Sequence, residues 1–384
     1  MADVVGRHRK KTEYYFDYSL VFIIIFLVGF GLIMLYSSSS YMAAQKYGDE
    51  AYWLKKQGLW STIGLIGMIV LSFIPYKFWE HFATAAYFVS AALIPCVLFF
   101  PARNGARRWI YIIKDKVYLQ PAEIAKLCMI LFLASFISRL GPAIRTRKGF
   151  WTCIGLALPH TAMIYFITDN LSSAIIVMGI TVVMLFVASP EYKRFLLLGA
   201  GALAAAALVV FIVTRFTEKL GFRGERILAW MDPEAYASDV GFQTLQGLYA
   251  IGSGGIWGKG LGQSIQKLGY IPEAQNDMIF SIICEELGMF GAIAIMLMFV
   301  LLIWRLVVIA NNATDLFGAL FVVGVLGHVA IQVILNISVV TNTMPNTGIS
   351  LPFISYGGSA VLFQMAEIGV CLNVARSIEL KDAA

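Results

Sequence analysis

Four acidic residues lie in or beside one strongly apolar stretch, and they are the side chains whose type and spacing most directly suggest chemistry. The stretch 269–288 reads GYIPEAQNDMIFSIICEELG, with Glu273 and Asp277 before a long apolar run and Glu285 and Glu286 inside it. A charge within a segment apolar enough for a membrane costs about 2.5–3.5 kcal/mol unless it is paired or hydrated. These acids must therefore either have a function or be paired with other groups.

Helix geometry separates the four acids. If a helix begins near Asp277, Glu285 lies about 80° around it and ~12 Å deeper, and Glu286 points to the opposite side. Asp277 is then the shallow carboxylate, which can accept a proton as a general base or cap the helix N-terminus. Both interpretations stay open. Glu285 and Glu286 are expected to be structural, held by partners on other spans.

The elements that position these residues are membrane helices. Of the 384 residues, 59% are hydrophobic and 14% are charged, and the mean hydropathy is +0.77; a soluble chain has roughly 25% charged residues. About ten apolar segments are long enough to span a bilayer: 17–38, 58–75, 80–100, 121–139, 151–168, 170–189, 194–214, 277–304, 315–339 and 357–376. We expect an all-α polytopic protein with a single membrane domain over 1–384.

The distribution of basic residues predicts the orientation. Lysines and arginines precede the first span and fill the loop from Arg139 to Lys148, so the positive-inside rule makes both termini, 1–16 and 377–384, cytoplasmic. The segment 215–276 between spans 7 and 8 is then a large extracellular loop with short amphipathic helices at ERILAWM and GFQTLQGLYAI. Two outer basic clusters, Lys46–Lys56 and Arg103–Lys116, either anchor lipid headgroups or bind an anion.

Several other classes of protein are disfavoured. A pI of 9.0 in a membrane protein does not indicate nucleic-acid binding. The five cysteines show no spacing typical of disulfide frameworks or zinc sites, and we expect no metal site built on His and Cys. The glycine-rich run 252–262 lacks the Walker A spacing, so it predicts a tight loop at the membrane surface.

Cations near the outer face suit a phosphate ligand. Arg107 and Arg108 are adjacent, and guanidinium groups bind phosphate oxygens in a fork. Lys126 either faces the same cavity or pairs with Glu123, three residues away on a helix. Lys267 in the large loop is a further candidate for contact with an anion.

Polar residues also occur inside the last two spans. His328, Gln332 and Asn336 follow at i, i+4 and i+8 and form one stripe, for which we expect hydrogen bonds between helices. Glu367 lies within span 10. That span opens with LPFISYGGSA, where Ser355, Gly357 and Gly358 indicate irregular backbone, which membranes tolerate only where protein buries it or it lines a wet cavity.

Three stretches together resemble the FtsW/RodA/SpoVE (SEDS) family: NGARRWI with QPAEIAKL, the run from GFQTLQGLYAIGSGG to QNDMIFSIICEELG, and MPNTGISLPFISYGGSA. YSSSS, YWLKKQ and PNTGI are more similar to the FtsW/SpoVE branch. The resemblance implies an inverting peptidoglycan glycosyltransferase that polymerises lipid II at the outer face of the bacterial cytoplasmic membrane, for septal or spore wall synthesis. It places the family's essential aspartate on Asp277, as the general base toward the acceptor's sugar hydroxyl. Arg107, Arg108, Lys126 and Lys267 become candidates to hold the lipid pyrophosphate.

The resemblance also implies partners. These are lipid II, a class B penicillin-binding transpeptidase, other divisome proteins and membrane lipids; a divalent cation, Mg²⁺ or Mn²⁺, can assist, although the sequence offers no dedicated ligand set. A lipid II flippase and a structural scaffold are the competing hypotheses. Two positions depart from the family pattern: Gln275-Asn276 stands where His-Thr is common, and 169–173 reads DNLSS where Pro-Asp-x-Gly-Thr is common.

Overall fold

The computed structural model describes residues 16–102, 105–113, 117–189, 191–215, 222–238 and 241–378. In this part of the chain ten helices are long and apolar enough to cross a membrane. They are α1 (Tyr18–Tyr47), α2 (Tyr52–Phe73), α3 (Tyr76–Leu93), α4 (Pro121–Leu140), α5 (Arg147–Thr168), α6 (Leu171–Ala188), α7 (Tyr192–Arg215), α10 (Ile279–Asn312), α11 (Leu316–Val340) and α12 (Gly358–Arg376). The expected polytopic helical fold is confirmed. The basic residues of 1–15 and most of the tail lie outside the described residues.

Polar side chains mark several of the helix starts. Asp17, Thr146, Asn170 and Asp315 each accept a hydrogen bond from the backbone N–H three residues on, at 2.8–3.0 Å. Each cap satisfies one of the N–H groups that the first helical turn leaves without a partner. Helix α1 extends past its predicted end at residue 38 and stops at Gly48, which adopts the left-handed conformation (φ 68°) that glycine tolerates best.

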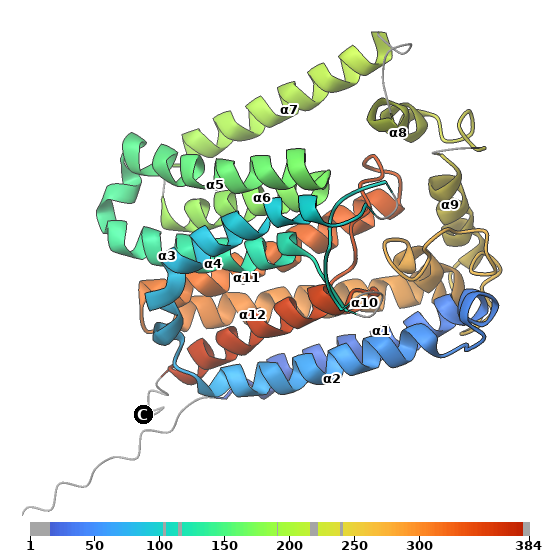
Figure 1. Ribbon diagram of the computed structural model, residues 1–384, viewed down its shortest axis with the longest axis horizontal. Helices are drawn as coiled ribbons and strands as arrows, with labels where there is room; N and C mark the ends of the chain where they lie inside the picture. Colours follow the sequence, from blue (N-terminus) through green and yellow to red (C-terminus); the bar gives the residue numbers. More distant parts are fainter. Residues whose placement is uncertain are drawn as a thin grey trace, which may run out of the picture.

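The bundle is built around α11, which packs against α4, α6, α10 and α12 (Figure 1). In the most apolar 18-residue part of α11, 67% of the residues are buried. In the corresponding part of α7, only 6% are buried. In Figure 1, α7 diverges from the other helices along its length. Apolar side chains on α7, such as Leu196 and Leu203, are therefore left to face lipid.

A short hairpin interrupts the helical pattern, and the sequence did not predict it. Strands β1 (Ile110–Ile113) and β2 (Val117–Leu119) pair antiparallel, with Ile110 opposite Leu119. Two short 3₁₀ helices, η1 (Pro95–Phe99) and η2 (Gly141–Arg145), follow α3 and α4. Strand β1 lies within the second basic cluster and β2 directly follows it; residues 103–104 and 114–116 of the cluster are outside the described part.

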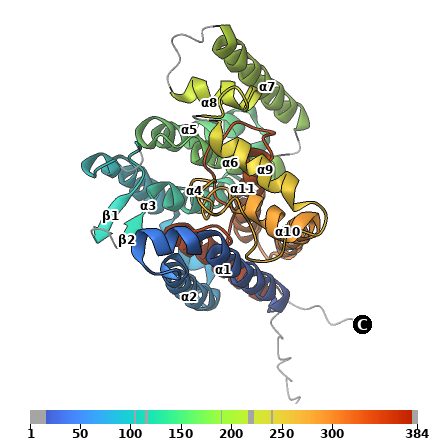
Figure 2. The same ribbon diagram turned by 90° about the vertical axis from the view of Figure 1, so that its right-hand side faces the viewer.

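One end of the bundle carries the long connections, residues 222–238, 241–278 and 341–357, and is named the loop end here (Figures 1 and 2). Helices α8 (Phe222–Met231) and α9 (Phe242–Gly254) stand there, at the two sequences expected to be amphipathic helices. Figure 2 looks onto this end and shows α8 and α9 above the start of α10. The loop end therefore gathers the acids of 269–288 with segments from distant parts of the chain.

Candidate active site at the loop end

Asp277 lies directly before α10, in a segment that α11 holds by its backbone. Asn336 Nδ2 donates to the carbonyl of Asp277 at 2.9 Å and to the carbonyl of Ile349 at 2.7 Å. The N-cap of α10 is Met278, which receives no side-chain cap, so Asp277 does not cap this helix. Its carboxylate is therefore available for chemistry.

The Asp277 carboxyl is partly buried among three polar side chains. Burial raises its pKa most, a hydrogen bond to its own backbone lowers it, Glu273 raises it, and Arg226 and Gln243 lower it; together these effects raise the pKa to about 6. Gln243 Nε2 donates to Asp277 Oδ1 at 3.3 Å. A carboxyl with a pKa near 6 is mostly ionised at pH 7 and still basic enough to accept a proton in a transition state.

Helix α8 brings Arg226 to this carboxylate. Trp230 Nε1 donates to the carbonyl of Asn342 at 3.0 Å, and Asn342 Nδ2 returns a bond to the carbonyl of Trp230 at 3.2 Å. Arg226 Nη1 donates to the carbonyl of Asn346 at 3.3 Å. Burial lowers the pKa of Arg226 and the charge of Asp277 raises it. Arg226 could not be singled out from the sequence, because nothing local in ERILAWM distinguishes it from a surface arginine.

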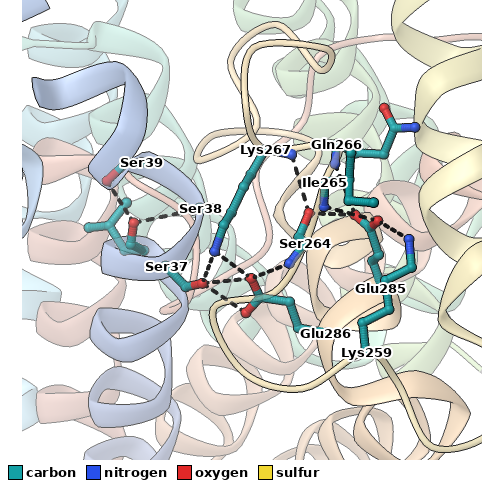
Figure 3. Close-up of polar contacts among 11 residues, drawn as sticks. Ser37, Ser38, Ser39, Lys259, Ser264, Ile265, Gln266, Lys267, Glu285 and Glu286 are labelled. Atoms are coloured by element: carbon teal, nitrogen blue, oxygen red, sulfur yellow. Dashed lines mark hydrogen bonds and ion pairs between the residues drawn. The ribbon is translucent and has the colours of Figure 1, made fainter. Parts of the chain in front are cut away.

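Glu285 is fully buried, and all but one of its partners come from the loop between α9 and α10 (Figure 3); the exception is Ser253, near the end of α9. Lys259 Nζ lies 2.7 Å from Oε1, and Ser253 Oγ donates to the same oxygen at 3.3 Å. The Ser264 hydroxyl donates to Oε2. Backbone N–H groups of 265 and 266 complete the set, at 3.2 and 3.3 Å. The expected partners on other spans are therefore replaced by a loop that folds back onto the helix.

Glu286 joins the same loop to α1 (Figure 3). Lys267 Nζ lies 2.9 Å from Glu286 Oε1 and 3.0 Å from Ser37 Oγ. Ser37 Oγ donates to both carboxylate oxygens, at 2.7 and 2.8 Å. Lys267 was predicted from the sequence to be a candidate phosphate ligand. In the structure it is only 7% exposed, and it forms an ion pair with Glu286.

The glycine-rich run covers a break in α10. Gly288 has φ 66° and ψ −164°, which interrupts the helix. Lys259 N and Gly260 N donate to the carbonyls of Glu285 and Glu286, both at 2.9 Å. In return, the N–H groups of residues 289 and 290 donate to the carbonyls of 255 and 256. The loop thereby satisfies backbone groups that an unbroken helix would pair internally, and it packs on α10.

Lys126 and Glu123 form a buried ion pair of 2.8 Å on α4. Lys126 Nζ also lies 3.5 Å from Gln332 Oε1, and Gln332 Nε2 donates to the carbonyl of Ser350 at 3.0 Å. Lys126 is 1% exposed. Between the two interpretations left open by the sequence, the structure therefore places Lys126 in the pair, beside the irregular segment that precedes α12.

His328, Glu367 and the segment before α12 also have contacts within the bundle. His328 Nδ1 lies 2.8 Å from Glu367 Oε2, joining α11 to α12. Ser355 Oγ accepts from the N–H of residue 351 at 2.8 Å, and Gly357 N donates to Gln57 Oε1 at 3.2 Å. A Cβ at Gly358 would lie 2.6 Å from the Trp60 ring. The segment 351–355 is buried, so protein rather than lipid surrounds its irregular backbone.

The two adjacent arginines bind carbonyl groups at the ends of α5 and η1. Arg108 donates to the carbonyl of Thr168 at 3.3 Å and to that of Asp169 at 2.7 Å. Arg107, which is exposed, donates to the carbonyl of Leu98 at 3.4 Å. The structure thus ties Arg108 to the backbone and leaves most of Arg107 at the surface.

The two departures from the family pattern have structural roles. Asp169 ends α5 in the left-handed conformation (φ 51°), and Asn170 caps α6. The carbonyl of Gln275 accepts from Tyr356 N at 2.9 Å, and the Asn276 amide donates to Glu273. Among the described residues, no group of three or more acidic, His or Cys side chains could hold a metal ion. Within this part of the chain, the residues present do not fit a dedicated site for a divalent cation.

Comparison with known proteins identifies the family. The family model for the FtsW/RodA/SpoVE cell cycle proteins matches residues 18–380. Stage V sporulation protein E of Bacillus subtilis is 38% identical over 372 residues, which cover 96% of this chain and 98% of that protein. A protein named probable peptidoglycan glycosyltransferase FtsW, from Trichlorobacter lovleyi, is 35% identical over 384 residues, covering 99% of this chain and 98% of the relative.

Solved structures share the fold. A chain of a peptidoglycan synthase complex, described as coordinating polymerization and crosslinking, superposes with a TM-score of 0.78 at 28% identity, covering 95% of this chain and 99% of that one. The rod shape determining protein RodA of Thermus thermophilus gives a TM-score of 0.69 at 25% identity, with 96% and 98% covered. Matches of this length and identity show that the chain belongs to the FtsW/RodA/SpoVE family of cell cycle proteins.

Proposed function

We propose that the chain is a peptidoglycan glycosyltransferase that polymerises lipid II, and that Asp277 is its general base. Family membership over 18–380 and the names of the FtsW relatives support the reaction class. The placement of one carboxylate supports the role of Asp277: it stands at the loop end beside Arg226, with a pKa raised to about 6.

The reaction needs one proton transfer and one displacement. Asp277 accepts the proton of the acceptor's sugar 4-hydroxyl. The oxygen so activated attacks the anomeric carbon of the growing chain, the bond to the lipid pyrophosphate breaks, and the configuration inverts. The Arg226 charge beside Asp277 favours the ionised base before the transfer.

The leaving pyrophosphate needs cationic ligands. Arg107 and Arg108 are proposed for this role because guanidinium groups bind phosphate in a fork. Lys126 and Lys267 already hold carboxylates at 2.8 and 2.9 Å. A phosphate would have to compete with those carboxylates, so the two arginines are the stronger candidates.

The orientation in the membrane is proposed from the same reaction, because lipid II is polymerised at the outer face. The loop end faces the outside of a bacterial cytoplasmic membrane and both termini face the cytoplasm. A class B penicillin-binding transpeptidase is the proposed partner, because a structural relative comes from a complex that couples polymerization with crosslinking. Division and sporulation are both proposed settings, since the relatives include FtsW proteins and a sporulation protein.

The experiment incubates the purified protein and its transpeptidase partner with labelled lipid II. Wild type should form polymer, and Asp277→Asn should form none. The control is Glu234→Gln, which neutralises an exposed acid of the same loop and should keep activity. Polymer from Asp277→Asn would refute the base. Lipid II crossing liposome membranes without polymer from wild type would instead favour a flippase.

A further inference from the structure

Two amide side chains connect the Asp277 carboxylate with the backbone of the connection between α11 and α12. Gly348 N donates to Asn346 Oδ1 at 3.0 Å. Asn346 Nδ2 donates to Gln243 Oε1 at 3.1 Å. Gln243 Nε2 completes the chain by donating to Asp277 Oδ1 at 3.3 Å. The three side chains come from α9, the connection between α11 and α12, and the segment before α10.

The direction of every bond in this chain is determined at its two ends. A backbone N–H can only donate, so the Asn346 oxygen faces Gly348 and its NH₂ group faces Gln243. The carbonyl of Pro272 can only accept, and Gln243 Nε2 donates to it at 3.1 Å. Gln243 therefore presents its NH₂ group, and not its oxygen, to Asp277.

The two oxygens of Asp277 are consequently different. Oδ1 is engaged by Gln243, whereas Oδ2 faces Gly348, an exposed residue without a side chain. A Cβ built on Gly348 would lie 3.6 Å from Oδ2. We propose that Gln243 and Asn346 are positioning residues that direct Oδ2 of Asp277 toward the acceptor hydroxyl as the proton-accepting oxygen. This inference rests on the proposed role of Asp277 as general base.

Two charged groups act on the pKa of Asp277 besides the amide of Gln243. Glu273 comes from the same segment and Arg226 from α8; Asn336 of α11 holds only the backbone carbonyl. The amide of Gln243 lowers the pKa of Asp277 because a donor stabilises the ionised carboxylate. Removing the amide should therefore raise the pKa of Asp277 and leave its carboxylate free to rotate.

The test measures the pH profile of lipid II polymerisation for Gln243→Ala, Asn346→Ala and the double variant. For Gln243→Ala we expect kcat to fall roughly tenfold with KM for lipid II nearly unchanged, and the acidic midpoint of kcat/KM to rise by about one pH unit, as for loss of a hydrogen bond to a charged group. Asn346→Ala should shift the midpoint less in the same direction, because Gln243 can then turn. The double variant should match Gln243→Ala.

Controls separate this inference from folding and from the base itself. Thr343→Ala changes an exposed residue of the same connection and should leave the midpoint in place. Gln243→Glu keeps the size of the side chain and should raise the midpoint the most, since two carboxylates then share one proton. An unchanged midpoint in Gln243→Ala and Gln243→Glu, or additive effects in the double variant, would overturn the positioning role. Polymer from Asp277→Asn would overturn the general base instead.

Discussion

Lys267 Nζ lies 2.9 Å from Glu286 Oε1, and this buried pair joins the loop before α10 to the helix that follows it. Ser37 of α1 bonds to both groups, so one ammonium connects three parts of the chain. Glu286 lies on the same stretch as Asp277, but the pair serves a different purpose. It holds the loop that closes the break in α10.

Breaking this pair on one side should destabilise the protein strongly. Lys267→Met leaves the Glu286 carboxylate buried without its cation, which costs about 3–5 kcal/mol in comparable pairs. We expect a large drop in the melting temperature in detergent. Adding Glu286→Gln to Lys267→Met should recover much of the loss, because the charge that lacks a partner is then gone.

The control for this pair is Lys55→Met. Lys55 pairs with Asp49 at 2.7 Å, but the side chains are 68% and 40% exposed. Exposed pairs are screened by water, so the melting temperature should hardly change. Equal losses for Lys267→Met and Lys55→Met would contradict the structural role of the buried pair.

Gly258 should be the least replaceable glycine of the loop. It has φ +77°, and a Cβ there would overlap the carbonyl of Glu286. Gly258→Ala should therefore separate the loop from α10 and cost more than the roughly 1–2 kcal/mol of left-handed backbone alone. Gly262 also has a positive φ (+80°) but has open space around it, so Gly262→Ala measures the backbone cost alone. Thermal unfolding of Gly258→Ala and Gly262→Ala compares them; equal melting temperatures would count against the contact.

The rate of polymerisation should fall as the pH drops through about 6. The pKa of Asp277 is about 6, and only its ionised form accepts a proton. Arg226 lowers that pKa, so Arg226→Gln should move the acidic midpoint of kcat/KM upward. Arg215→Gln, at an exposed arginine that ends α7, should not move it. A midpoint that stays fixed in Arg226→Gln would disprove the coupling.

Asp277→Asn should stabilise the protein while abolishing polymerisation. The pKa of Asp277 is about 6 in the folded protein against 3.8 for the ordinary side chain, so the folded state binds the proton more tightly than the unfolded state. Stability from this group is therefore highest below pH 3.8 and falls as the pH rises to 6, by about 3 kcal/mol in all. The neutral amide avoids that loss. Melting temperatures at pH 7.5 should favour the variant, with the advantage shrinking toward pH 4.

The two arginines can be compared with an arginine at the opposite end of the bundle. Arg107→Ala and Arg108→Ala should raise KM for lipid II, roughly tenfold for the loss of a charged contact. Arg108→Ala should also lower the melting temperature, because two carbonyls lose their donor. Arg145→Ala removes an exposed charge near η2 and should leave KM unchanged. Equal effects on KM in all three would refute a pyrophosphate site at 107–108.

The membrane fold could be predicted from the sequence because of a backbone constraint. Apolar segments of about twenty residues must pair their N–H and C=O groups internally in lipid, and a helix does so. Ten such segments were recognised, and ten spanning helices are present in the described part. Asp277 could also be distinguished from Glu285 and Glu286 in the sequence, as the shallow acid at the start of an apolar run. The ends of the helices were less certain, since α1 continues past its apolar residues to Tyr47.

The partners of each charge were decided only by the tertiary structure. Glu285 and Glu286 are neighbours on one helix, yet one binds Lys259 and the other binds Lys267 and Ser37, because the loop folds over the break at Gly288. The neighbours of Asp277 likewise come from separate segments: Gln243 and Asn346 bond to each other although they are 103 positions apart along the chain. Local periodicity carries no information about such contacts. They depend on how the long connections pack against the helix ends, so the sequence could single out Asp277 as a candidate, whereas only the fold determined which residues surround it.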